Sequence, residues 1–310
     1  MQPGLPSKTA FAAAAHRAAH QQIENGLIFR DSLAIPILGP DSAAIIHESS
    51  QKHGQPDAQR KMRMFIAMRS RYTEDALDAA VKSGVRQLVV LGAGLDTFAY
   101  RSPYAHSLRV FEVDHSATQA WKRQRLAEAE IPIPDWLTFA PIDFERESLP
   151  EGLAAAGFDP TQQTFFTWLG VVPYLTEDAI WTTLSFIAGI PGGAHVIFDY
   201  SDPPETMDPE VRTYHDARAR RVADIGEERA IVAGADAPEM GRKIVDERAG
   251  FPEGRAIRLG NEERNAALPK LVRNDFLLRR PYRQKAESEW TGCLDVSQTG
   301  FDGGRVVNEI

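Results

Sequence analysis

The chain has 310 residues, of which 43% are hydrophobic and 25% charged, a size that allows one large domain. Its net charge of −8 gives no electrostatic support to a nucleic-acid partner, and its single cysteine, Cys293, excludes an internal disulfide and a cysteine-based metal cluster. No apolar run approaches the ~18 residues of a membrane span and no signal-peptide core opens the chain, so we expect a cytoplasmic protein without a membrane partner.

The first predicted elements are helices that extend to about residue 82. An alanine-rich helix is expected over 9–24, ended by an Asn-Gly pair, and a longer helix over 58–82. In the first of these, His16 and His20 have the spacing of metal ligands on one helix face. No third ligand candidate accompanies them, so we predict no metal.

A short apolar run over 88–91 predicts a strand buried on both faces of a parallel sheet. It leads directly into a turn containing Gly92 and Gly94, where the backbone of an α/β protein can approach a nucleotide-like ligand. A dinucleotide fingerprint would need a third glycine at position 97, which is Thr97. A second strand, over 109–113, ends in Asp114, where a carboxylate can accept hydrogen bonds from ribose hydroxyls.

The segments LGAGLDTFAYR (91–101) and FEVDHSATQAWKRQRL (111–126) resemble S-adenosylmethionine (SAM)-dependent methyltransferases of the leucine carboxyl methyltransferase type. The resemblance extends from about residue 9 to about residue 197. It implies SAM as the cofactor and an α/β fold of the class I SAM-methyltransferase kind. That fold has a central, mostly parallel Rossmann-like sheet with helices on both faces, preceded here by N-terminal helices and carrying an inserted lid.

The resemblance also implies positions that bind the cofactor. Arg17 is implied to contact the carboxylate of SAM, although it also fits a surface arginine of an amphipathic helix. Arg69, the first arginine of an Arg-Ser-Arg element, is implied to grip the same carboxylate through its guanidinium fork, with a structural salt bridge as the alternative. Together with residues discussed below, the predicted cofactor-binding set is Arg17, Arg69, Gly92, Gly94, Asp114, Asp143, Phe144 and Leu169.

The later members of this set follow the third and fourth predicted strands. After a strand over 137–142, Asp143 and Phe144 match the family pair that holds adenine, and Phe144 replaces the family's leucine. After a strand over 164–168, Leu169 stands where the family has a glutamate, and Gly170 matches the following glycine. Any contact made by that glutamate side chain is therefore in doubt.

We expect a single methyltransferase domain over 1–310. Its expected parts are a helical segment over about 9–82, core strands over about 85–200 and 250–280, a lid over about 201–240, and a tail over 281–310 that matches no pattern. Within the core segment over about 250–280, strands are expected over 256–259 and 276–280.

The predicted function is O-methylation of a carboxylate, or of a hydroxyl, on a small molecule. A carboxylate is ionised at neutral pH and needs no general base, so no catalytic residue is assigned; a phenol would need one, and His195, Asp199 and His215 are the candidates. Alternatives are methylation of a protein C-terminal carboxylate, a nicotinamide-dependent oxidoreductase and a non-catalytic SAM-binding protein, and the oligomeric state stays open. The residues expected to line an apolar substrate pocket are Trp168, Val171, Val172, Tyr174, Tyr200 and Tyr214.

Overall fold

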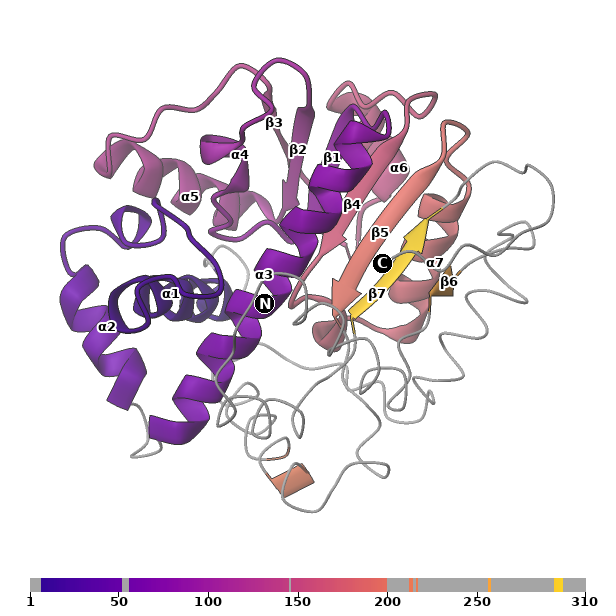
Figure 1. Ribbon diagram of the computed structural model, residues 1–310. Helices are drawn as coiled ribbons and strands as arrows, with labels where there is room; N and C mark the ends of the chain where they lie inside the picture. Colours follow the sequence, from indigo (N-terminus) through magenta and orange to yellow (C-terminus); the bar gives the residue numbers. More distant parts are fainter. Residues whose placement is uncertain are drawn as a thin grey trace.

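The computed structural model describes residues 7–51, 56–144 and 146–199, with the short segments 212–213, 216, 256–257 and 293–297. Figure 1 shows a central sheet with helices on both sides and a group of N-terminal helices next to it. Among these described residues, no helix is both long and apolar enough to cross a membrane.

In the described part of the chain, the central sheet has seven strands in the order β3-β2-β1-β4-β5-β7-β6. The first five run parallel to their neighbours, and β7 is antiparallel to β5 and β6. The strands are β1 (Gln87–Leu91), β2 (Arg109–Asp114), β3 (Leu137–Pro141), β4 (Thr164–Trp168), β5 (Ala194–Asp199), β6 (Ala256–Ile257) and β7 (Cys293–Ser297). This topology confirms the predicted class I methyltransferase sheet.

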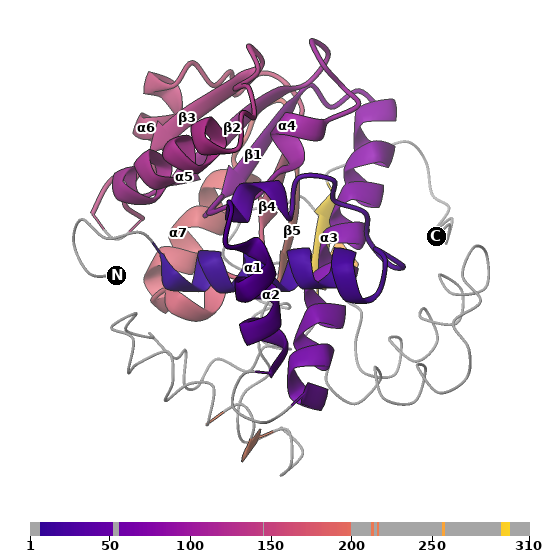
Figure 2. The ribbon, with the colours of Figure 1, turned by 90° about the vertical axis from the view of Figure 1, so that its left-hand side faces the viewer.

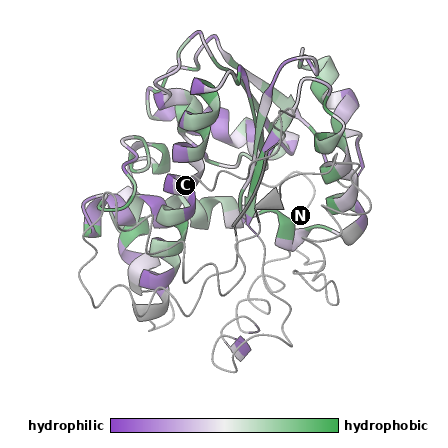
Figure 3. Ribbon diagram, turned by 45° about the vertical axis from the view of Figure 1, so that its right-hand side comes forward, coloured by the Kyte–Doolittle hydropathy of each residue, from purple (hydrophilic) through white to green (hydrophobic). Residues whose placement is uncertain are grey.

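Helices cover both faces because the central strands are apolar on both faces. In β1, Leu88 and Val90 pack with α3 and α4 on one face, whereas Val89 and Leu91 pack with α6 and α7 on the other. Figure 3 shows the hydrophobic strands between these two helix layers. The helices of the sheet are α3 (Pro56–Lys82), α4 (Phe98–Arg101), α5 (Ser116–Glu128), α6 (Leu149–Ala155) and α7 (Glu177–Ala188), with a short 3-10 turn, η3 (Val172–Tyr174), before α7.

The N-terminal helices pack on the turn that follows β1 (Figure 2). They are α1 (Lys8–Ile23), the 3-10 turn η1 (Pro36–Leu38) and α2 (Ser42–Gln51). Helix α1 begins one residue before its predicted start, where the Ser7 hydroxyl accepts a hydrogen bond from Ala10 N–H at 3.0 Å. Its alanines form one cluster with Leu95 and Leu126. Small side chains thus allow α1 to lie close against the β1 turn.

The C-terminal part of the sheet differs from the sequence-based expectation. Strand β7 (Cys293–Ser297) lies in the tail to which the sequence assigned no structure, and it pairs antiparallel with β5. Strand β6 (Ala256–Ile257) falls within the strand expected over 256–259. The strand expected over 276–280 lies outside the described residues. Within the described residues, the antiparallel neighbour of β5 is therefore formed by a segment of the tail, for which the sequence predicted no element.

A buried ion pair lies beneath the second strand. Glu112 of β2 is fully buried, and its carboxylate lies 2.6 Å from the ammonium of Lys122 on α5, which is 1% exposed. Tyr100 donates to the same carboxylate oxygen at 3.3 Å. Burial, opposed by Lys122, raises the pKa of Glu112 to about 7.

This raised pKa predicts a specific pH dependence of stability. The folded protein keeps the Glu112 proton up to about pH 7, whereas the unfolded chain releases it near the ordinary value of 4.5, so the free energy of unfolding falls as pH rises between these values. Glu112→Gln should remove this fall, which is on the order of 1–3 kcal/mol. Urea unfolding at about pH 5 and about pH 8 measures it.

The matched control is Glu128→Gln, which changes an exposed carboxylate on α5 and should leave the wild-type slope intact. Equal pH slopes in wild type and Glu112→Gln would contradict the assigned titration.

Candidate active site

The carboxyl ends of the parallel strands form one edge of the sheet. Strand β1 lies between β2 and β4, so the chain order reverses at this point. Ligands of open α/β sheets bind outside the carboxyl ends of the strands at such a reversal. The segments that follow β1 to β5 therefore form the candidate site.

The turn after β1 requires glycine at two positions. The φ angles of Gly92 and Gly94 are 67° and 46°, in the left-handed region that other residues rarely adopt. A Cβ on Gly92 would lie 2.3 Å from Val171 Cγ2, and one on Gly94 would lie 2.8 Å from Ala10 Cβ. The turn is thus enclosed by α1 on one side and by the segment after β4 on the other.

Asp114 ends β2 next to this turn, where the sequence predicted it. Its carboxylate accepts hydrogen bonds from the N–H groups of Gly94 at 2.6 Å and of His115 at 2.7 Å. Asp114 is 8% exposed, and burial raises the pKa of its carboxyl while these hydrogen bonds oppose the shift. A carboxylate offers about four acceptor positions, so these two backbone bonds and the hydrogen bond from the Thr118 side chain do not exhaust it.

Asp143 and Phe144 follow β3 on the neighbouring side of the site. Asp114 pairs with Pro141, two residues before Asp143, which brings the two acids to the same edge of the sheet. The Asp143 side chain is 26% exposed, and its N–H donates to Glu147 Oε2 at 2.7 Å. Phe144 packs against the hydrophobic cluster beneath α6 and α7.

Arg69 of α3 reaches the ends of β4 and β5. Its Nη1 lies 2.5 Å from Asp199 Oδ2, and the other carboxylate oxygen of Asp199 accepts the Gly170 N–H at 2.5 Å. A Cβ on Gly170 would lie 3.0 Å from the Arg69 guanidinium, so glycine lets this cation approach the backbone. Leu169 packs partly buried against the cluster beneath α3. The Arg69 guanidinium is thereby fixed beside Gly170, which directly follows the position of the family's glutamate, Leu169.

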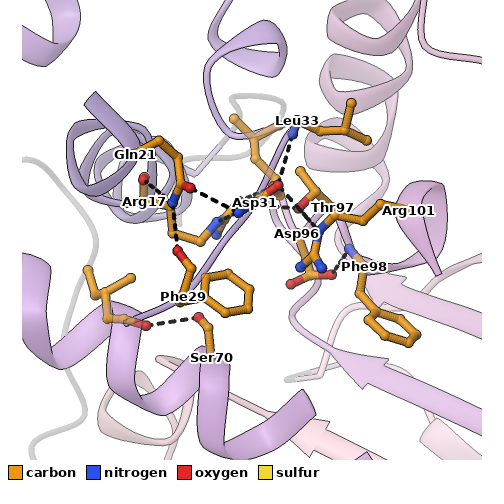
Figure 4. Close-up of polar contacts among 12 residues, drawn as sticks. Arg17, Gln21, Phe29, Asp31, Leu33, Ser70, Asp96, Thr97, Phe98 and Arg101 are labelled. Atoms are coloured by element: carbon orange, nitrogen blue, oxygen red, sulfur yellow. Dashed lines mark hydrogen bonds and ion pairs between the residues drawn. The ribbon is translucent and has the colours of Figure 1, made fainter. Parts of the chain in front are cut away.

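Arg17 of α1 is bound to the turn after β1 (Figure 4). It is 9% exposed, and its Nη2 donates to the carbonyl oxygen of Leu95 at 2.5 Å. Its Nε donates to Asp31 Oδ2 at 3.3 Å. Arg17 is therefore a buried residue in contact with the loop, and the surface alternative is wrong.

The residues predicted for the substrate pocket differ in exposure, and two of them are not described by the structure. Trp168 is fully buried against Phe198, and its indole N–H has no partner among the described residues. Tyr174 is half-buried in η3. Tyr200 and Tyr214 lie outside the described residues, as does the general-base candidate His215.

His195 and Asp199 lie at opposite ends of β5. His195 stacks on Phe165 near the start of the strand, and burial lowers the pKa of its imidazole. Four residues of strand place it about 13 Å from the carboxyl end, where Asp199 is bound to Arg69. His195 is therefore remote from the edge at which ligands bind.

The histidines at metal-ligand spacing have another explanation in α1. The Nε2 atom of His20 accepts hydrogen bonds from the N–H groups of Ile28 and Phe29, both at 3.3 Å. Within the described ranges, no three potential ligand side chains come together.

One polar residue of this region was not identified from the sequence. Asp31 is 2% exposed and contacts both Arg17 and Thr97, and the latter directly follows the β1 turn. Its local signal is only an Asx-type hydrogen bond from Leu33 N–H at 3.0 Å, which many loop aspartates make.

Residues 10–188 match the family model described as leucine carboxyl methyltransferase. The chain is 34% identical over 223 residues to the Bacillus subtilis protein named "Putative S-adenosyl-L-methionine-dependent methyltransferase YktD", covering 65% of this chain and 73% of that protein. It is 36% identical over 196 residues to a protein of the same description from Streptomyces avermitilis, covering 61% of this chain and 66% of that protein.

Solved structures of methyltransferases are also similar in outline. A crystal structure described as a "putative methyltransferase" from Thermobifida fusca aligns over 96% of both chains at 15% identity with a TM-score of 0.48. An O-methyltransferase family protein from Burkholderia thailandensis aligns over 77% of this chain and 79% of its own at 13% identity, with a TM-score of 0.39. The fold assignment above rests instead on the strand order and directions.

The family match covers more than half of the chain and decides between the two cofactors considered from the sequence, in favour of SAM over a nicotinamide. The chain belongs to the leucine carboxyl methyltransferase family and is a SAM-dependent methyltransferase.

Proposed function

We propose that this enzyme transfers the methyl group of SAM to a carboxylate of a small molecule. SAM supplies an electrophilic methyl group on a sulfonium, and the protein has to bind the cofactor, align the acceptor and exclude water. The residues at the carboxyl edge of the sheet fit these tasks.

The cofactor's nucleoside is assigned to the ends of β1, β2 and β3. Gly92 and Gly94 let this turn pack closely against Val171 and Ala10, where a Cβ would clash, and so hold the turn at the carboxyl end of β1. Asp114 keeps acceptor capacity for ribose hydroxyls, and Asp143 with Phe144 lies at the next strand end for the adenine.

The carboxylate of the methionine part is assigned to Arg69. Its pairing with Asp199 occupies one of the five N–H donors of the guanidinium, which leaves donors for a second carboxylate. Gly170, which follows Leu169, lies with its backbone beside the Arg69 guanidinium. The replacement of the family's glutamate by Leu169 therefore leaves the positive charge of Arg69 in place. Arg17, which donates a hydrogen bond to Leu95 O, is the second candidate for the contact with this carboxylate.

The choice of a carboxylate as the acceptor rests on the binding partners of Asp199 and on the position of His195. Asp199 is committed to Arg69 and to the Gly170 N–H, and His195 lies near the opposite edge of the sheet. Neither is available to deprotonate an acceptor at the β4 and β5 ends. An acceptor that arrives already ionised, such as a carboxylate, needs no such base.

A small acceptor is supported by the residues assigned to its pocket. Those within the described residues are apolar or aromatic, such as Val171 and Tyr174, and an apolar lining suits a compact hydrophobic acid. The lid predicted over about 201–240, which carries Tyr214 and His215, lies outside the described residues apart from 212–213 and 216. The family description also names a carboxyl acceptor, so a protein C-terminal carboxylate is the second candidate.

Asp114→Asn should weaken SAM binding by about 1.5–3 kcal/mol, the scale of hydrogen bonds to a charged group. The asparagine oxygen can still accept the Gly94 N–H, while its NH2 group replaces the oxygen that accepts the His115 N–H, so the change removes the charge and one acceptor. Calorimetric titration of the folded variant with SAM measures the effect. Asp135→Asn changes an exposed aspartate near the amino end of β3, at the opposite side of the sheet from the carboxyl ends, and serves as the control, with unchanged affinity expected. An unaltered dissociation constant for Asp114→Asn would rule out the ribose assignment.

Labelled SAM, offered with a panel of free acids, phenols and a peptide with a free C-terminus, should label a free acid. Mild base should release that label as methanol, because a methyl ester hydrolyses under conditions that leave an aryl methyl ether intact. Base-labile label on the peptide alone would favour the protein acceptor instead. Base-stable label would overturn the carboxylate proposal and make His215 the general base to test.

A further inference from the structure

A buried polar network joins the N-terminal segment to the turn that follows β1 (Figure 4). Its centre is Asp31, whose side chain is fully buried. The carboxylate accepts the Thr97 hydroxyl at 2.7 Å, Arg17 Nε at 3.3 Å and Leu33 N–H at 3.0 Å. Arg101 Nε lies 3.3 Å from its second oxygen. Four donors therefore converge on one carboxylate.

The network binds two residues that follow the glycine turn after β1. Arg17 donates to Leu95 O, immediately after Gly94, and Thr97 lies two residues further along the chain. Asp31 therefore binds both Arg17, which contacts Leu95, and Thr97. Thr97 is 1% exposed and stands where a dinucleotide-binding turn would have its third glycine. The hydroxyl at this position donates to Asp31 and accepts a hydrogen bond from Arg101 Nε at 3.2 Å.

The outer side of the network is also charge-balanced. Arg101 donates through both terminal nitrogens to Glu74 of α3 and packs its guanidinium over the Phe29 ring at 5.1 Å. Although burial alone lowers it, the hydrogen bond and the charge of Glu74 raise the pKa of the Arg101 guanidinium. Arg101 is therefore a cation that lies between the carboxylates of Asp31 and Glu74.

We infer that Asp31 is a positioning residue for the cofactor: through Thr97 and Arg17 it fixes the turn after β1 in the conformation that receives SAM. The inference rests on the proposed cofactor site and extends it to a residue that does not touch the ligand. It also gives Arg17 a defined task, which is to hold Leu95 O. A turn that is already ordered in the free protein loses no further conformational entropy when SAM binds. The network therefore strengthens SAM binding.

A second buried ion pair in the same segment provides a comparison. Glu24, at the end of α1, binds Arg63 of α3 at 2.8 Å, with side chains 14% and 6% exposed. This pair also ties α1 to α3, but among the described residues it makes no hydrogen bond or ion pair to the turn. A purely structural role for Asp31 would make the two pairs equivalent.

The test compares Thr97→Val with Thr97→Ser, because the first removes the hydroxyl at constant shape and the second keeps it. Thr97→Val should raise the SAM dissociation constant about tenfold, because it removes the hydroxyl that donates to Asp31 and accepts from Arg101 Nε, and Thr97→Ser should stay near wild type. The turnover number at saturating SAM should change less than the KM for SAM. Amide exchange over 92–97 should be faster in Thr97→Val than in Thr97→Ser.

Asp31→Asn and Glu24→Gln complete the comparison. Both should lower the melting temperature, but only Asp31→Asn should also weaken SAM binding measured well below that temperature. Equal SAM affinity of Thr97→Val and Thr97→Ser would overturn the inference, as would an equal affinity loss in Glu24→Gln. Wild-type protein that binds no SAM would instead contradict the cofactor assignment itself, so the two failures are distinguishable.

Discussion

The hydrogen bond from Gly94 N–H to the Asp114 carboxylate joins the ends of the two central strands on which the site depends. It forms only because β1 and β2 are parallel and in register, with Leu91 beside Val113, and because Gly94 adopts a positive φ. Pairing of β1 with β4 on its other side places Gly170 and Arg69 across the same turn. The sheet register therefore determines which polar groups meet.

The parts of this arrangement that depend on local pattern were predictable. An apolar run followed by two glycines, and an acid after the next strand, led to Gly94 and Asp114 at the positions where the structure has them. Arg69 was predictable only through the family resemblance, because its partner Asp199 is 130 residues away. Whether these residues hold SAM as assigned stays a prediction.

Other parts could not be predicted because they depend on tertiary contacts. Asp31 and Thr97 are 66 residues apart, and nothing near Asp31 distinguishes it from an ordinary loop acid. Strand β7 is five residues long, and its strand conformation comes from pairing with β5 rather than from a strong apolar pattern. In both cases the deciding interaction lies outside any sequence window that periodicity arguments use.

In the proposed site, one end of SAM lies at Asp114 and the other at Arg69, across the point where the strand order reverses. A crystal structure with S-adenosylhomocysteine tests this most directly. We expect ribose hydroxyls within hydrogen-bonding distance of Asp114 and the ligand's carboxylate on the Arg69 guanidinium, with Asp199 still paired to it. A ligand bound away from the β1 turn, or one whose carboxylate makes no contact with Arg69, would contradict it.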